Sequence, residues 1–458
     1  RSWDELQPRE GARLRRTTGL IAMGASMSAL PAATRTTGGR PLTNRWLALC
    51  LLVLVAVLNY ADRFLMAGLA QPIKAHFAMG DAMMGALMGP AFALLYTLFA
   101  LPIARLADLR SRVVIVATGC AVWSLFTLLS GLATTPAMLA LARIGVGIGE
   151  AAYQAPTAAL IAAYFPLEQR GRAFALLGTA IYFGQMMGIA GGPAIAAHAD
   201  WRAAFHALGI AGLVVAGATL LVVREPAREG AAQSAAQQAA PPFMATMRLL
   251  LATPSVRHLA GLLAFGTLSG VTFALWGPAL FERAFALSNK AAGATFALSF
   301  GLPGLAGMLG FGFVVDRYGS RDPTFQLRLA AWSLAACTAL ILAVTWCGSL
   351  LLARVLAVPA GLLGGGWSVS VLAALQYLLP NRLRATGTAV VLLITGLFAN
   401  VIGPVLSGQL SDWVAGNGPL GLRIGLSVAI PTAYIGVWTA LAAVRTLERD
   451  REALSDPA

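Results

Sequence analysis

The chain has 458 residues, of which 58% are hydrophobic and only 11% are charged, and its formal net charge at pH 7 is +14. A soluble globular protein carries roughly 25% charged residues. This chain therefore cannot cover a water-facing surface, and its apolar excess must face lipid. The basic residues lie singly or in pairs between apolar runs, which argues against nucleic-acid binding. The four cysteines have no metal-site spacing, and we expect no metal and no cofactor.

Apolar runs of about 20 residues, the length that crosses a bilayer, recur along the chain. They predict an all-α membrane protein with twelve transmembrane helices. We place the spans near residues 46–70, 83–106, 113–132, 137–164, 172–198, 203–223, 258–281, 291–314, 326–347, 349–379, 385–411 and 422–444.

Polar segments divide these spans into two six-helix bundles. The predicted parts are an N-terminal arm, a first bundle, a linker rich in Ala, Gln and Pro, a second bundle and a tail, at residues 1–45, 46–223, 224–257, 258–445 and 446–458. Most Lys and Arg residues fall on the side of the membrane that holds the arm, the linker and the tail. The positive-inside rule then predicts an inner-membrane protein with both termini in the cytoplasm.

Two short patterns repeat between the halves. Asp108, which follows the second span, has a counterpart in Asp316 after the eighth span. The segment from Pro166 to Arg170 resembles the segment from Pro380 to Arg384, at nearly the same offset along the chain. Two matches at nearly one spacing indicate duplication of a six-helix unit. Parallel repeats of this kind form the halves of rocking carriers.

The loop after the eighth span carries a recognisable pattern, which consists of Gly312, Asp316, Arg317, Gly319 and Arg321. It resembles the loop signature of the major facilitator superfamily, and its first-half counterpart keeps only Asp108 and Arg112. The run from Arg143 to Ala151 is similar to that superfamily's fourth-helix motif. The resemblance covers about residues 46–445.

A narrower resemblance comes from three segments: Asn59 to Arg63, Arg143 to Ala151, and Trp201 to Phe205. Together they look like bacterial members of the Spinster family, which implies transport of sphingosine-phosphate-like molecules or lysophospholipids. The Asn59 to Arg63 element also occurs in organic anion:cation symporters of the same superfamily. A proton-linked symporter of small organic anions is therefore the alternative.

Four charged residues of the first bundle lie deep inside predicted spans: Asp62, Arg63, Arg143 and Glu150. An ionised group at mid-bilayer costs at least about 2.5–3.5 kcal/mol. At about 1.5 Å per residue, Asp62 and Arg143 lie level, and Glu150 lies about 10 Å deeper on the same helix face as Arg143. Adjacent residues point about 100° apart, so we aim Asp62 at Arg143 and Arg63 sideways, toward a neighbouring helix.

This arrangement predicts a switch in which protonation of Asp62 or Glu150 frees Arg143 to hold an anionic headgroup. The alternative is a permanent ion-pair cluster that only joins two helices. Candidate substrate-binding residues are Tyr60, Arg63, Arg143, Glu150, Phe273, Trp276 and Trp367. For the three aromatic residues of the second half, core packing is the alternative. A charged half that faces an apolar half suits an amphipathic substrate.

The repeated loops predict gates. Asp108 is expected to pair with Arg170 or Arg172, and Asp316 with Arg382 or Arg384, in the outward-open state. Arg112, Arg317 and Arg321 complete this predicted set, and ordinary surface charge is its alternative interpretation.

We expect a monomer that engages protons, membrane lipids and either an amphipathic lipid or a small anion. The scattered histidines and the lack of a nucleophile–base pair argue against an enzyme.

Overall fold

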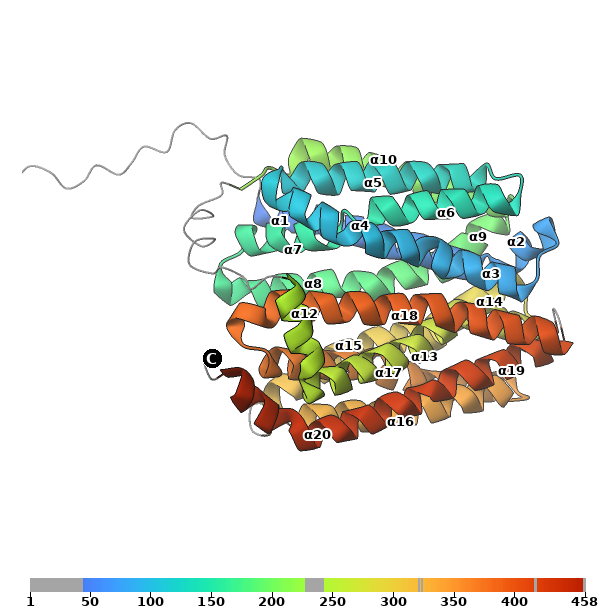
Figure 1. Ribbon diagram of the computed structural model, residues 1–458. Coiled ribbons are helices and arrows are strands. Elements are labelled where there is room, and N and C mark those ends of the chain that lie inside the picture. Colours follow the sequence, from blue (N-terminus) through green and yellow to red (C-terminus); the bar gives the residue numbers. More distant parts are fainter. Residues whose placement is uncertain (1–43, 227–242, 320–321, 323, 416–417, 456–458) are drawn as a thin grey trace, which may run out of the picture. The chain divides into compact units, whose positions relative to one another are not determined.

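The structure, a computed structural model, describes residues 44–226, 243–319, 322, 324–415 and 418–455. Nearly all of the predicted arm, residues 1–45, thus lies outside the described residues. The chain divides into two units, Arg1–Pro41 and Leu42–Ala458, and everything below concerns the second. Its described residues form long helices that run side by side and contain no strand (Figure 1).

Each predicted span corresponds to one long or segmented helix. The first half contains α1 (Arg45–Gly68), α3 (Asp81–Met88) with α4 (Pro90–Leu109), α5 (Arg112–Gly131), α6 (Pro136–Glu150) with α7 (Gln154–Tyr164), α8 (Leu167–Met186) with η1 (Met187–Gly191) and α9 (Gly192–Ala196), and α10 (Trp201–Val222). The second contains α13 (Pro254–Phe285), α14 (Asn289–Phe296) with η2 (Ala297–Gly301) and α15 (Leu302–Tyr318), α16 (Phe325–Trp346), α17 (Leu350–Leu378), α18 (Asn381–Ala415), and α19 (Pro419–Ala429) with η3 (Ile430–Thr432) and α20 (Ala433–Ser455).

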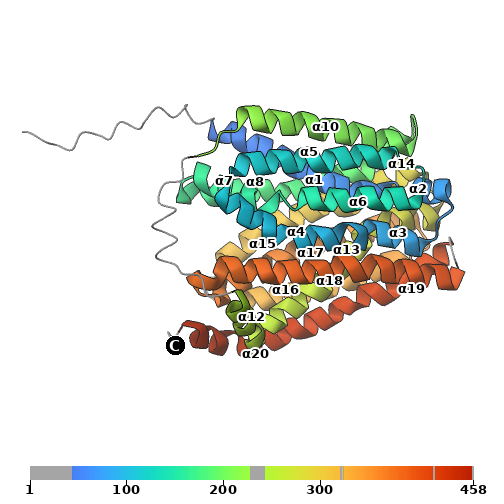
Figure 2. The same cartoon turned by 45° about the horizontal axis from the view of Figure 1, so that its top comes forward.

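Two shorter helices lie outside the spans, α2 (Ala70–Phe77) and α12 (Phe243–Ala252). They mark opposite ends of the helix bundle, called here the α2 end and the α12 end (Figures 1 and 2). Among the described residues, 11 helical stretches are long and apolar enough to cross a membrane. The segmented pair α6 and α7 supplies one more, so the twelve-helix fold is confirmed.

Prolines explain where the spans are segmented. Pro156 lacks the N–H that would bond to Ala152, four residues earlier, and the break between α6 and α7 falls on Ala151–Tyr153, directly after Glu150. The π-helical turns η1 and η2 each end two residues before a proline, Pro193 and Pro303 respectively. π-turns inside helices occur frequently at functional sites.

The sequence repeat is also a structural repeat. Ala78 and Ala286, which stand at the same spacing as Asp108 and Asp316, both adopt a left-handed conformation, with φ of 51° and 50°, and end α2 and α13. Arg170 donates a hydrogen bond from Nε to the carbonyl of Phe165. Its counterpart Arg384 donates in the same way to Leu379. Both offsets found in the sequence therefore mark equivalent positions of the two halves.

Glycines allow α1 to lie close to α8 and η1. A Cβ atom added to Gly184 would lie 2.5 Å from the carbonyl oxygen of Val57, and one added to Gly188 would lie 2.5 Å from that of Ala61. Small residues at four-residue spacing permit such backbone approach in membranes. This packing fixes the rotation of α1 and turns Asp62 away from α8, into the first half.

Candidate functional site

The first ion pair of the site is sealed inside the first half. Arg143 on α6 donates from Nη1 to Oδ2 of Asp62 on α1 at 2.7 Å. Thr127 on α5 donates to the other carboxylate oxygen at 2.5 Å, and Ser130 accepts from Arg143 at 3.1 Å. The two charged side chains are only 1% and 3% exposed. The predicted pairing of Asp62 with Arg143 is confirmed, and it joins α1, α5 and α6.

The second ion pair is partly open. Arg63 donates from Nε to Oε2 of Glu150 at 2.6 Å, and its side chain is 25% exposed whereas that of Glu150 is 0% exposed. Three aromatic rings surround the guanidinium group, with centroids 5.5 Å away for Tyr60, 4.5 Å for Phe92 and 4.8 Å for Tyr96. We call these rings the aromatic box.

Glu150 therefore pairs with Arg63, whereas the predicted switch had protonation of Glu150 free Arg143. Residues seven apart on one helix lie about 10 Å apart along its axis, too far for a direct bond. Long side chains on a helix lean toward its N-terminus, and α1 and α6 run in opposite directions. Arg63 thus leans toward the level of Glu150.

Several buried polar atoms near these pairs have no hydrogen-bond partner among the described residues. They include Oε1 of Glu150, Nε of Arg143 and both amide atoms of Asn59. Asn59 is 0% exposed and lies one turn before Asp62 and Arg63 on α1. Because buried polar groups are nearly always satisfied, Glu150 retains one oxygen that is available to a further donor.

A second charged cluster joins the two halves at the α2 end. Asp81, at the start of α3, accepts two hydrogen bonds from Arg283 of α13, at 2.7 and 2.6 Å, and one from Ser411 of α18 at 2.6 Å. Lys74 of α2 also donates to Asp81. In return, Asp412 of α18 accepts from the backbone N–H groups of residues 81 and 82, both at 2.8 Å. We call these five residues the α2-end latch.

Carboxylates of both halves are thus held by donors of the other half. Asp412 occupies the N-terminus of α3, where exposed N–H groups and the helix dipole favour an anion. Burial lowers the pKa of the Lys74 ammonium group, although its hydrogen bond to Asp81 acts in the opposite direction. The latch closes the α2 end by charged contacts as well as apolar ones.

Repeat symmetry extends to a second contact at this end. Glu282 and Asn289 are the repeat counterparts of Lys74 and Asp81, at the spacing that also relates Ala78 to Ala286. Asn289 donates to Glu282 at 2.9 Å and, across the halves, to the carbonyl of Gly68 at 2.9 Å. Glu282 and Asp412 lie inside α13 and α18, just beyond the span limits that hydropathy suggested, so the second half also carries acids at the ends of its spans.

The predicted gate residues lie toward the α12 end. Asp108, Arg172, Asp316 and Arg317 are exposed, and Arg112 begins α5. Arg170 and Arg384 bond to backbone carbonyls of their own halves. Arg321 and the side chain of Arg382 lie outside the described residues. The gating role of this set stays a prediction.

The three aromatic residues proposed for the second half are buried, Trp367 in a cluster of the second half and Phe273 and Trp276 in a cluster that also contains residues of the first half. Phe273 packs against Phe296 and Phe300, with ring centroids 5.4 and 5.0 Å away. Trp276 donates from its indole nitrogen to the carbonyl of Pro404 at 3.1 Å, and Trp367 is 6% exposed. Core packing accounts for these positions here, and their part in substrate binding stays a prediction.

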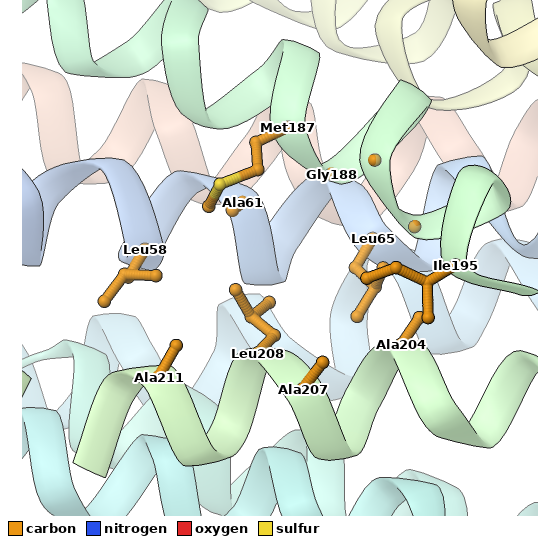
Figure 3. A pocket seen from close by; sticks show the side chains of 12 residues that line it. Leu58, Ala61, Leu65, Met187, Gly188, Ile195, Ala204, Ala207, Leu208 and Ala211 are labelled. Carbon is orange, nitrogen blue, oxygen red and sulfur yellow. The ribbon is translucent and has the colours of Figure 1, made fainter. Parts of the chain in front are cut away.

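A separate cavity of about 180 Å³ lies between α1, the η1–α9 segment and α10 (Figure 3). Leu58, Ala61 and Leu65 face it from α1, and alanines of α10 form its opposite wall. Its lining is apolar and uses a different face of α1 from that of Asp62 and Arg63. The cavity is therefore distinct from the charged site.

Known proteins resemble this chain over most of its length. A family model described as Major Facilitator Superfamily matches residues 52–404. The chain is 31% identical over 371 residues to an "MFS-type efflux pump" of Mycolicibacterium smegmatis, covering 80% of this chain and 84% of that protein. It is 30% identical to "Protein spinster homolog 1" of Homo sapiens, covering 81% and 74% respectively.

Among solved structures, one similar fold is a bacterial homologue of the human lysosomal transporter Spinster, in an inward-facing and unoccupied conformation. Its TM-score is 0.79 at 25% identity, and the match covers 92% of this chain and 100% of that one.

Proposed function

Because the chain belongs to the Major Facilitator Superfamily and, within it, to the Spinster-like transporters, we propose that it is a proton-linked carrier of amphipathic lipids. Family and fold make it an integral membrane secondary transporter rather than an enzyme. The proposed substrates are lysophospholipids or sphingosine-phosphate-like molecules. The observation that carries the proposal is a partly open pair, Arg63 with Glu150, beside a sealed pair, Asp62 with Arg143.

Coupling follows from competition at the open pair. A carboxylate that accepts a proton no longer attracts the guanidinium group beside it. Protonation of Glu150 would therefore release Arg63, which is 25% exposed, to hold an anionic part of the substrate. Asp62 is the second proposed proton site, and its pair with Arg143 holds α1 against α6 until it is protonated. In this scheme, Arg63 takes the headgroup role that the sequence analysis assigned to Arg143.

Alternating access supplies the movement. The α2-end latch favours the state in which the halves meet at the α2 end. The predicted gates, Asp108 with Arg170 or Arg172 and Asp316 with Arg382 or Arg384, belong to the opposite state. We place the α12 end in the cytoplasm of a cell whose inner membrane holds the protein, in agreement with the distribution of Lys and Arg.

Two alternatives use the same scaffold. Export of other amphipathic compounds is favoured by the relative described as an efflux pump. Symport of small organic anions is favoured only by the Asn59 to Arg63 element. Of the two arginines in the ion pairs, Arg143 is sealed and Arg63 is partly exposed, so Arg63 is the cation that a small anion would reach. Direction of flux and length of the preferred substrate separate these alternatives from the lipid carrier.

The test is flux in proteoliposomes with an imposed pH gradient. We expect the gradient to drive accumulation of lysophospholipids, and a protonophore to abolish that accumulation. Short carboxylates serve as the competing substrates. Accumulation of short carboxylates without lysophospholipids, or lysophospholipid flux that ignores the pH gradient, would contradict the proposal.

A further inference from the structure

Two equivalent helix pairs occupy matching places in the two halves: α4 with α6 in the first half, and α15 with α17 in the second. The side chains of Thr135 and Ser349 cap α6 and α17 at the same offset that relates the segments after the fourth and tenth spans. In α3 and α14, the offset that relates Ala78 to Ala286 applies. Each position of one helix pair can therefore be compared with its counterpart in the other.

In the first half, an apolar pocket of about 410 Å³ lies at this helix pair. Leu87, Pro90 and Leu94 line it from α3 and α4, and Ala140 and Ile144 line it from α6. Every side chain of the lining is apolar. The pocket therefore offers a lipid acyl chain a contact surface, but it offers no charge to a headgroup.

The second half carries a polar pair at corresponding positions. By the two offsets, Thr295 of α14 stands where the first half has Leu87, and Arg354 of α17 stands where it has Ala140. These two side chains contact each other, with Nη2 of Arg354 donating to Oγ1 of Thr295 at 3.1 Å. One of two equivalent places on the molecule thus holds a positive charge, and the other is wholly apolar.

Arg354 is exposed among side chains that face lipid. On its own helix face, Leu351 and Val358 are 73% and 44% exposed, and on the neighbouring η2 turn Leu298 is 61% exposed. In the described part of the chain, Arg354 forms no ion pair, and its hydrogen bond goes to Thr295. A guanidinium group has more N–H donors than one hydroxyl oxygen can accept. Because unsatisfied donors are costly in lipid, this group calls for an anionic acceptor.

The level of Arg354 in the bundle suits a phospholipid phosphate. The helix α17 begins at the α2 end, where Arg423 of α19 donates to the carbonyl of Cys347. Arg354 is the fifth residue of α17, so its Cα lies about 6 Å along the helix from that start. Side chains on a helix lean toward its N-terminus, and long basic side chains near the end of a span reach the interface. The guanidinium group therefore reaches the headgroup level, above the exposed apolar side chains.

We propose that Arg354 and Thr295 form a headgroup site for an anionic membrane phospholipid, whose acyl chains lie on the exposed apolar side chains of η2, α15 and α17. The planar guanidinium group binds a phosphate through two parallel, charge-assisted hydrogen bonds, and Thr295 holds that group in place. A zwitterionic lipid binds more weakly, because its ammonium group adds a second positive charge beside Arg354. The occupant is a lipid and not a free phosphate ion, since the side chains exposed around the arginine are apolar.

The experiment cross-links lipid to the full-length protein in phosphatidylcholine nanodiscs. Two trace probes carry the same photoreactive acyl chain, one with a phosphatidylglycerol headgroup and one with a phosphatidylcholine headgroup. Mass spectrometry of peptides measures labelling of α17 and, as an internal reference, of α6. We expect the anionic probe to label α17 about tenfold more than the zwitterionic probe, the factor expected of a charge-assisted contact. The two probes should label α6 equally, and excess glycerol phosphate should not reduce the labelling of α17.

Substitutions assign the headgroup preference to the two residues. Arg354→Leu should abolish the preference of α17 for the anionic probe, and Thr295→Val should reduce it about threefold, as expected for loss of a neutral hydrogen bond. Lys290→Leu is the matched control, because it removes a positive charge from the start of α14 on a different face from Thr295, and it should leave the preference unchanged. Melting temperatures of all variants identify any that fail to fold.

Three results would overturn the site. Equal labelling of α17 by the two probes is the first, and a preference that survives Arg354→Leu is the second. An equal loss in Lys290→Leu is the third, because it would trace the preference to the general charge of the α2 end. Displacement of the probe by glycerol phosphate would overturn the assignment to a lipid. None of these measurements uses flux, so their outcome is independent of the proposed transport function.

Discussion

Neutralising Arg283 should open the α2 end. Arg283 contributes two hydrogen bonds to Asp81, and Asp81 keeps Lys74, a partner within its own half, when Arg283 is replaced. The loss is therefore that of a charge-assisted contact and not that of a fully orphaned carboxylate. Such contacts are worth about 1.5–3 kcal/mol. At about 1.4 kcal/mol per factor of ten, Arg283→Met should shift the conformational equilibrium about 10- to 150-fold toward the state with an open α2 end.

Distances between spin labels measure this shift. Ala75 and Lys290 are exposed, lie at the α2 end and belong to different halves. Labels on cysteines at these positions, with Cys50 replaced by serine, should report mainly short distances in the parent protein. Arg283→Met should add a population at longer distance.

The matched control is Arg423→Met. Arg423 contacts the Cys347 carbonyl and the Trp346 ring, both in its own half, so its loss should leave the distances unchanged. Identical distance distributions for Arg283→Met and the parent protein would refute the latch. An equal shift in both variants would also refute it, because it would trace the effect to general loosening.

Three further changes test the packing of the site. Arg143→Met should lower the free energy of unfolding by about 3–5 kcal/mol, because it leaves the buried carboxylate of Asp62 unpaired. Adding Asp62→Asn should restore most of that free energy, and thermal melting in detergent checks both variants. Gly188→Leu should cost about 1–3 kcal/mol through overpacking, whereas Gly217→Leu, at a position with open space around its Cβ, should melt as the parent does. Pro156→Ala should not lower the melting temperature, since it restores a helical hydrogen bond, yet it should slow flux by straightening the break beside Glu150.

Hydrophobic runs were sufficient to predict the spans, because a bilayer demands a fixed length of apolar helix. The rise of about 1.5 Å per residue was also sufficient to predict that Asp62 and Arg143 lie at the same depth in the membrane. The partner of Glu150 was missed because depth along one helix carries no information about how a long side chain leans. Pro156 could have been used to predict the break between α6 and α7, since a proline within a span interrupts the helix about one turn earlier.

The α2-end latch was beyond reach for a different reason. Asp81 and Asp412 lie at the limits of their spans, where charges are ordinary. The hydrogen bond from the backbone N–H of Asp81 to the Asp412 carboxylate joins the first half to the second, across most of the length of the chain, and no local pattern encodes such a contact. A usable signal was the charge balance at one end of the bundle, where Lys74 and Arg283 accompany these acids.

The most direct test of proton coupling compares two modes of transport in Glu150→Gln. Exchange of labelled for unlabelled lysophospholipid across a membrane without a pH gradient needs no net proton movement, whereas accumulation driven by a pH gradient does. We predict that Glu150→Gln retains exchange and loses gradient-driven accumulation, and that Glu168→Gln, at an exposed acid of α8, retains both. Gradient-driven accumulation at the parental level in Glu150→Gln would contradict the account.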